Sequence, residues 1–239
     1  MPNNYFQFKQ FKIEQEKSSM KVCTDSCLFG AWIADKLEQN KINAANLLDI
    51  GTGTGLLSLM IAQKKKISID ALEIDENSFH QTELNFNASP WRQQLKVFHE
   101  DIKNWNNHIK YELIISNPPF YENDLKAIQQ NKNIAKHNDG LTFDDLIKSV
   151  KVNLAANGKF AVLLPYRRVA FFKQLASEGR LFLEEELLVK QTPKHNWFRG
   201  ILLFGQSTAS RVVNELTIKN AEGHYTKEFD ELLKDYYLD

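Results

Sequence analysis

The segment Asn117-Pro118-Pro119-Phe120 carries residue types suited to chemistry on a planar nitrogen. Its two prolines lack backbone N–H groups and hold local carbonyl groups outward, while Asn117 adds a side-chain carbonyl. Two such acceptors can bind both hydrogens of one amino group and direct its delocalised lone pair at an electrophile. Phe120 would stack on a planar substrate. Elsewhere in a chain this segment would be read as an ordinary proline turn, so its place in the fold decides the interpretation.

A glycine-rich turn lies earlier in the chain, in the run Asp49-Ile50-Gly51-Thr52-Gly53-Thr54-Gly55. Glycine lets the backbone approach a ligand closely, so such a turn can cradle a nucleotide or an amino-acid group. A tight strand-to-helix connection is the structural alternative. Dinucleotide-binding folds use the spacing G-x-G-x-x-G, whereas these glycines alternate. The pattern favours a mononucleoside ligand, with Asp49, Gly51, Gly53 and Gly55 as candidate binding residues.

Acidic residues follow the next two apolar runs. Glu73 lies about 20 residues after the glycines, where a carboxylate can accept hydrogen bonds from both hydroxyl groups of a ribose. Asp75 follows at a position that favours capping a helix beginning near Glu76. Asp101 could accept a hydrogen bond from the adenine amine of the ligand, or it could cap a helix over 102–107. The three features in this order predict a nucleoside site.

Short apolar runs that alternate with helical patterns must position these residues. Strands are expected at Asn46–Ile50, Ile67–Ile74, Leu95–His99, Glu112–Ser116 and Lys159–Leu164. This rhythm is typical of βαβ units in a parallel sheet. Because ligands bind at the carboxyl ends of strands in open α/β sheets, the candidate residues should meet at one edge. The polar stretch Tyr121–Gly140 is expected to be a functional loop beside it.

Further elements flank this core. Phe6, Phe8, Phe11 and Ile13 alternate with polar residues as in a strand, and a helix is expected over Asp25–Gln39. Leu181–Lys190 and Gly200–Gly205 are expected to be antiparallel strands that close the edge of the sheet, and Lys227–Leu238 a surface helix. We expect one domain over residues 1–239, in which 1–45 form an extension packed on a Rossmann-like core over 46–239.

Composition narrows the classes of function. The chain has 239 residues, with 30 Lys plus Arg and 30 Asp plus Glu, so any nucleic acid must bind a local basic patch. No apolar run is long enough for a membrane helix, and the N-terminus does not resemble a signal sequence, which predicts a cytoplasmic protein. Cys23, Cys27 and six dispersed histidines suggest neither a disulfide framework nor a metal site.

Taken together, Asp49–Gly55, Glu73, Asp101 and Asn117–Phe120 resemble the class I S-adenosylmethionine-dependent methyltransferases that act on nitrogen. Upstream, Phe8–Phe11 and Met20–Asp25 resemble the N-terminal segment of the bacterial tRNA(Val) adenine-N6 methyltransferases. The resemblance implies a mostly parallel seven-stranded sheet with an antiparallel edge strand and helices on both faces. It also implies S-adenosylmethionine as cofactor, with Asn117 beside it and without a metal.

The same resemblance assigns roles near the N-terminus and in the second half of the chain. Lys21, Thr24 and Asp25 would contact the methionine end of the cofactor, and Thr24 or Asp25 could cap the following helix, either instead or at the same time. Asn131–His137 resembles a basic loop, with Lys136 where arginine is expected, and Pro193–Gly200 resembles a closing hairpin. The implied partner is a tRNA, methylated on the adenine that adjoins the anticodon on its 3′ side. Its candidate contacts are Lys136, His137, Lys194 and Arg199.

Other functions remain open. A protein-glutamine N5-methyltransferase also uses an Asn-Pro-Pro-aromatic segment, but it normally carries a longer helical region upstream than residues 1–45 provide. An rRNA guanine-N2-methyltransferase is a further possibility. A non-catalytic RNA-binding module that retained the fold would not need paired acceptors at Asn117–Phe120. Nothing in the sequence indicates an obligate protein partner or an association with membranes.

Overall fold

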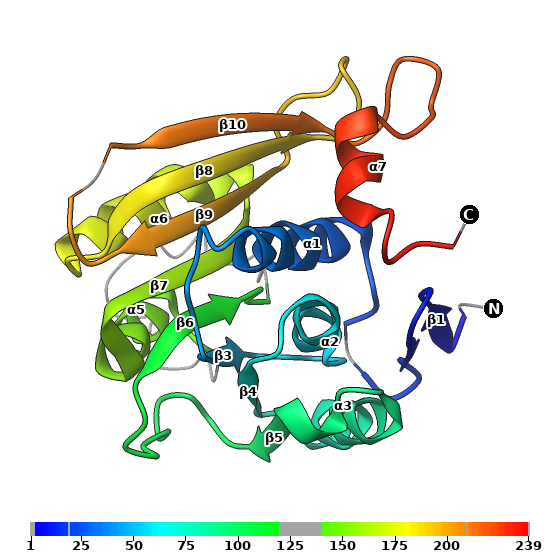
Figure 1. The fold of residues 1–239 in the computed structure, drawn as a ribbon. Coiled ribbons are helices and arrows are strands. Elements are labelled where there is room, and N and C mark those ends of the chain that lie inside the picture. Colours follow the sequence, from blue (N-terminus) through cyan, green and yellow to red (C-terminus); the bar gives the residue numbers. More distant parts are fainter. Residues whose placement is uncertain (1–2, 19, 120–139, 209, 239) are drawn as a thin grey trace.

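The computed structural model describes residues 3–18, 20–119, 140–208 and 210–238. Eight strands form its central sheet: β3 (Asn46–Ile50), β4 (Ser68–Glu73), β5 (Leu95–His99), β6 (Tyr111–Ser116), β7 (Leu154–Pro165), β8 (Phe182–Lys190), β9 (Arg199–Gly205) and β10 (Val212–Thr217). Their order across the sheet is β10-β8-β9-β7-β6-β3-β4-β5 (Figure 1). The α/β class and the parallel core expected from the sequence are therefore confirmed.

Two details of the expected sheet are wrong. Within the described residues the sheet has eight strands instead of seven, and its antiparallel strand, β9, lies inside the sheet between β7 and β8. The additional strand is β10, which pairs in parallel with β8. We did not expect β10 from the sequence. Most of this strand is exposed, including Val212 and Val213, and Leu216 is its buried residue.

Helices cover both faces of the sheet. They are α1 (Thr24–Glu38), α2 (Leu56–Lys64), α3 (Glu76–Ala88), α5 (Phe143–Asn153), α6 (Tyr166–Glu178) and α7 (Lys227–Leu233). Alternate strand residues face opposite sides: Leu47 packs with residues of α1 and α2, while Leu48 packs with residues of α5 and α6. Strands buried on both faces read as continuous apolar runs, which is why the parallel core was visible in the sequence.

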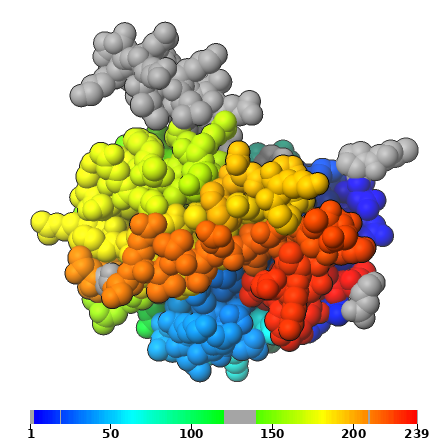
Figure 2. Space-filling model, turned by 90° about the horizontal axis from the view of Figure 1, so that it is seen from above, coloured from blue at the N-terminus to red at the C-terminus, as the bar shows by residue number. Residues whose placement is uncertain are grey.

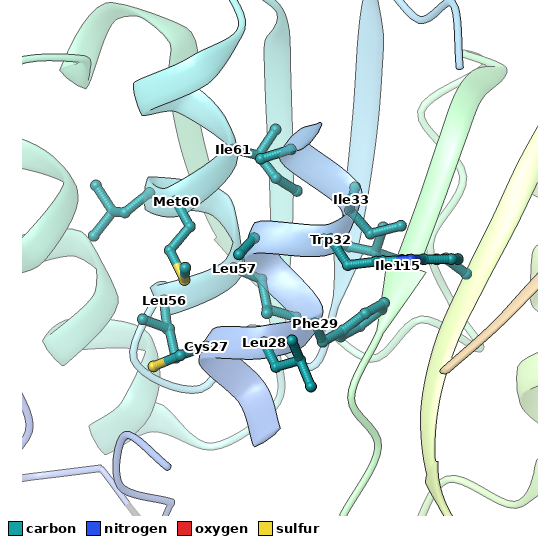
Figure 3. Packing of buried hydrophobic residues seen from close by; sticks show 14 of the residues in the cluster. Cys27, Leu28, Phe29, Trp32, Ile33, Leu56, Leu57, Met60, Ile61 and Ile115 are labelled. Atoms are coloured by element: carbon teal, nitrogen blue, oxygen red, sulfur yellow. The ribbon is translucent and has the colours of Figure 1, made fainter. Parts of the chain in front are cut away.

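Close packing of α1 on α2 fixes the N-terminal helix over the sheet (Figure 3). A Cβ on Gly30 would lie 2.8 Å from the sulfur of Met60, so a larger residue there would force the Met60 side chain to shift. This contact holds the first turn of α1 near the carboxyl ends of β3 and β6, where Ser26 reaches Asn117.

The N-terminal strand pattern folds as a hairpin of β1 (Tyr5–Gln7) and β2 (Lys12–Glu14), not as one strand. The N–H of Phe8 donates to the carbonyl of Phe11 and closes the turn. That turn contains neither glycine nor proline, so the sequence offered no sign of it. Asn85 of α3 bonds to both the N–H and the carbonyl of Glu14, which fastens the hairpin to the core.

The C-terminal helix α7 is shorter than the expected Lys227–Leu238 and ends at Leu233. Beyond it, the buried Tyr236 donates from its hydroxyl to the carbonyl of Met60 at 3.0 Å. Figure 2 shows α7, in red, beside the orange band of β10 on the surface. Among the described residues, none of the helices is long and apolar enough to cross a membrane.

Candidate functional site

A pocket of about 260 Å³ opens at the carboxyl ends of β3, β4 and β6. The predicted residues Lys21, Gly51, Gly53, Glu73, Asp101 and Asn117 line it, as does Pro119. Thr24, Asp25, Asp49, Gly55 and Pro118 do not line it. These residues come from five separate regions of the sequence and meet at the carboxyl ends of the strands, where the strand pattern predicted them.

The glycine turn follows β3 directly, and its three glycines have left-handed backbones, with φ of 71° at Gly51, 62° at Gly53 and 80° at Gly55. A Cβ on Gly51 or Gly53 would meet no atom within 4 Å, so both face open space. A Cβ on Gly55 would lie 2.6 Å from the ring of Phe86. The first two glycines leave room for a ligand, whereas Gly55 leaves room for the core.

Glu73, the last residue of β4, is buried beside this turn. Its Oε2 accepts a hydrogen bond of 2.9 Å from the N–H of Gly53, and its Oε1 accepts one of 2.9 Å from the N–H of Asp75. Each oxygen retains a second acceptor site for a ligand hydroxyl. Asp75 is the N-cap of α3, and its carboxylate accepts from the N–H of Ser78 at 2.8 Å, which confirms the capping prediction.

Asp49 lies beneath the turn and supports it. Its Oδ2 accepts hydrogen bonds from the hydroxyls of Thr52, at 2.8 Å, and Ser58, at 2.7 Å. Its Oδ1 is buried and has no hydrogen-bond partner among the described residues. Complete burial raises the pKa of Asp49 to about 6, against the opposing effect of the two hydroxyls. The aspartate therefore shapes the turn from below without lining the pocket.

Asp101 lies just after β5, at the far side of the pocket. Its Oδ1 accepts from the N–H of Lys103 at 2.9 Å, and its Oδ2 lies 3.1 Å from the ammonium of the same residue. These contacts form a turn, and the helix expected over 102–107 is absent from this described segment. The buried Ile102 and the exposed Ile74 also line the pocket. An exposed isoleucine at a strand end is a signal that the sequence interpretation missed.

Asn117 follows β6 and is one of the residues that line the pocket. Its Nδ2 donates a hydrogen bond of 2.9 Å to the hydroxyl of Ser26 in α1. Its Oδ1 is buried and lacks a hydrogen-bond partner in the described part of the chain. Pro118 is buried and Pro119 is exposed at the rim, while Phe120 lies outside the described residues. The amide therefore has a fixed donor side and an unused acceptor.

The segment before α1 is arranged differently from the expectation. Lys21 lines the pocket, but Thr24 and Asp25 are the first residues of α1. The expected capping by Thr24 or Asp25 is wrong, because the N-cap is Cys23 and no side chain caps this helix. The carboxylate of Asp25 instead accepts from the Nε of Arg199 at 2.5 Å.

The predicted RNA contacts fall in two groups. Arg199, the first residue of β9, holds the ion pair with Asp25, whereas Lys194 is exposed in the connection between β8 and β9. Lys136 and His137 lie outside the described residues, as do residues 121–139 of the predicted loop. Ser26 is a site residue that the sequence interpretation missed, since a serine in a helical pattern carries no local sign of a partner 91 residues away.

Comparison with known proteins places this geometry in context. Residues 30–164 match the family model of the methyltransferase small domain. The tRNA1(Val) (adenine(37)-N6)-methyltransferase of Pseudoalteromonas translucida is 40% identical over 234 residues, which are 98% of this chain and 98% of the relative. The enzyme of the same name from Flavobacterium johnsoniae is 38% identical over 237 residues, covering 98% and 99% of the two chains.

Solved structures share the fold at lower identity. A predicted O-methyltransferase from Agrobacterium tumefaciens superposes with a TM-score of 0.68 at 15% identity and covers 88% of this chain and 96% of its own. A putative class I S-adenosylmethionine-dependent methyltransferase from Listeria monocytogenes gives a TM-score of 0.61 at 14% identity, with 84% and 69% coverage.

Proposed function

The chain belongs to the family of the tRNA1(Val) (adenine(37)-N6)-methyltransferases, and we propose that its Asn117 amide holds the target amine during methyl transfer. The enzyme transfers the methyl group of S-adenosylmethionine to N6 of adenine 37 in tRNA(Val). A tRNA substrate supports our proposal that the protein is cytoplasmic. The glutamine and guanine alternatives become rival outcomes of the test below.

The observation that carries the role of Asn117 is the unequal use of its two amide atoms. Nδ2 donates to Ser26, while the buried Oδ1 accepts nothing from the described residues. A buried acceptor without a partner is costly, so its presence at a pocket favours a ligand that donates a hydrogen bond there. The exocyclic amine of adenine is such a donor.

The pocket residues also fit S-adenosylmethionine. The open faces of Gly51 and Gly53 leave room for the nucleoside against the backbone. Glu73 would accept from the ribose hydroxyls with the acceptor sites that Gly53 and Asp75 leave unused, and Asp101 would accept from the adenine amine of the cofactor. Lys21, which also lines the pocket, would hold the methionine carboxylate.

When bound, the cofactor supplies a methyl group on a positively charged sulfur. Oδ1 of Asn117 accepts a hydrogen bond from one hydrogen of the adenine amine, and a carbonyl of the Pro118–Pro119 turn accepts the other. These two bonds rotate the lone pair of the nitrogen out of the base plane and toward the methyl carbon, and orientation of this kind supplies much of the rate. With the amine held in this way, its nitrogen would take the methyl group from the sulfonium, leaving a neutral thioether, and would lose one proton to water.

The test is transfer of labelled methyl from S-adenosylmethionine to tRNA(Val) that lacks the modification, followed by nucleoside analysis. We expect N6-methyladenosine at position 37, and a rate about a hundredfold lower in Asn117→Ala. Asn214→Ala, which removes an exposed amide in β10, is the matched control and should keep the native rate. Label in protein glutamine or in guanine, with adenine unlabelled, would overturn the substrate. A native rate in Asn117→Ala would overturn the role of the amide.

A further inference from the structure

An ion pair joins the start of α1 to the start of β9. The Nε of Arg199 lies 2.5 Å from Oδ2 of Asp25, and the side chains are 25% and 11% exposed. Neither residue lies where its expected role requires, because Asp25 is not in the pocket lining and the guanidinium of Arg199 is turned toward α1. The two residues, 174 positions apart in the sequence, instead bind each other.

Ser26 connects this ion pair to the amide of Asn117 by hydrogen bonds. Oδ1 of Asp25 accepts from the backbone N–H of Ser26 at 3.2 Å, and the Oγ of Ser26 accepts from Nδ2 of Asn117 at 2.9 Å. Ser26 is 5% exposed and lines the pocket together with Asn117. We propose that Asp25 and Arg199 are positioning residues that fix Ser26 and thereby hold Oδ1 of Asn117 toward the substrate amine. This inference rests on the proposed role of Asn117.

The need for such a device follows from the shape of an amide. The two ends of the Asn117 amide are nearly equal in size, so packing alone cannot select which one faces the pocket. The hydroxyl of Ser26 accepts from Nδ2 of Asn117, and it selects the NH₂ end when its own O–H is donated elsewhere, for which the Sγ of Cys23 lies at 3.0 Å. If Ser26 moved, the amide could rotate and present a donor to the donor of the substrate.

The ion pair is well suited to hold that acceptor still. Asp25 is largely buried, and a buried carboxylate without a partner is strongly disfavoured, so the pair persists once formed. The Sγ of Cys23 lies 3.0 Å from the Oγ of Ser26 and gives the hydroxyl a second neighbour. The orientation of the amide is therefore set from α1 and β9 together, outside the loop that carries Asn117.

A second ion pair on the same helix provides a matched control. The ammonium of Lys36 lies 2.6 Å from Oε2 of Glu185, with side-chain exposures of 6% and 18%. It joins the last turn of α1 to β8, roughly 16 Å along the helix from Asp25. Asp25→Asn and Glu185→Gln each convert a paired carboxylate into an amide of the same shape. Both should lower the melting temperature.

Only the first substitution should change turnover. We expect Asp25→Asn to lower kcat for tRNA methylation at least about tenfold while both KM values stay within about threefold, and Glu185→Gln to keep kcat within about twofold. A raised KM for S-adenosylmethionine with unchanged kcat would make Asp25 a cofactor contact and overturn the proposal. Equal losses of kcat in both variants would reduce the pair to a structural one.

Arg199→Gln separates positioning from RNA contact. It should lower kcat as Asp25→Asn does, and the double variant should lose no more than the worse single variant, because both remove one coupled interaction. If Arg199→Gln raised KM for tRNA alone, or if the two losses multiplied, the residues would act separately and the proposal would fail.

A measurement without substrate keeps the inference distinct from the proposed function. The side-chain NH₂ signals of Asn117, assigned with Asn117→Ala, should shift and broaden in ¹⁵N spectra of Asp25→Asn and remain native in Glu185→Gln. Ser26→Ala, which leaves the ion pair intact, should produce the same change even if Asp25→Asn folds poorly. Unchanged signals in Ser26→Ala would overturn the positioning role, whatever RNA the enzyme methylates.

Discussion

The Oε2 atom of Glu73 accepts a hydrogen bond of 2.9 Å from the backbone N–H of Gly53, so the acidic end of β4 holds the glycine turn that follows β3. The other oxygen of Glu73 accepts from the N–H of Asp75 at the start of α3. One carboxylate thus contacts both the glycine turn after β3 and the residue that caps α3. Its shape and its acceptor count both matter, which makes it a sensitive place to test the site.

Glu73→Gln should weaken cofactor binding, since the new NH₂ group faces a backbone N–H and one acceptor toward the ribose is lost. We expect the dissociation constant for S-adenosylmethionine to rise at least about tenfold, measured by calorimetry, with an unfolding free energy lower by about 1–3 kcal/mol. Glu112→Gln is the control. Glu112 accepts from the N–H of Ala45 at the amino ends of β3 and β6, away from the pocket at their carboxyl ends. It should lose stability alone, and an equal loss of affinity there would contradict a local role for Glu73.

Gly53→Ala should impair the turn in two ways. The left-handed φ of 62° is unfavourable for alanine by about 1–2 kcal/mol, and the new methyl group would occupy the open face toward the ligand. Gly223→Ala shares the strain, with a φ of 88° and open space around its Cβ, but lies in the turn before α7. Urea unfolding should show a similar loss for both variants. Calorimetry should show a weaker affinity for S-adenosylmethionine in Gly53→Ala alone, and comparable affinities would place the ligand elsewhere.

The raised pKa of Asp49 predicts that the stability of the protein depends on pH. Burial raises its pKa from 3.8 to about 6, so the folded protein holds the proton over a range in which the unfolded chain has lost it. The unfolding free energy should therefore fall by about 3 kcal/mol between pH 4 and pH 6 and level off above that range. Asp49→Asn should remove this component. Urea denaturation from pH 4 to pH 8 tests it, and parallel curves for the two proteins would contradict the raised pKa.

Features that depend on local pattern were predictable, and features that depend on distant partners were not. The strands Asn46–Ile50 and Leu95–His99 have the bounds that their apolar runs indicated, and the cap at Asp75 followed from its place between strand and helix. The pairing of Asp25 with Arg199 produces no periodic pattern in the sequence, because it depends on how α1 crosses the sheet. Ser26 escaped notice for the same reason.

Of the predicted tRNA contacts that the structure describes, Lys194 is exposed, whereas Arg199 pairs with Asp25 of α1. Lys194 therefore remains the candidate for contact with the tRNA backbone. It is exposed in the connection between β8 and β9, which leaves the sheet at the same edge as Asn117. Loss of one phosphate contact weakens binding uniformly and lowers the salt dependence by about one unit of slope. Lys194→Glu should therefore raise KM for tRNA and flatten the plot of log Kd against log salt, with kcat unchanged.

Lys41→Glu is the control. It changes an exposed lysine before the amino end of β3, away from the pocket, and should leave both quantities native. If the two variants weaken tRNA binding equally, the effect is one of net charge, and the substrate approaches the pocket without contacting this connection.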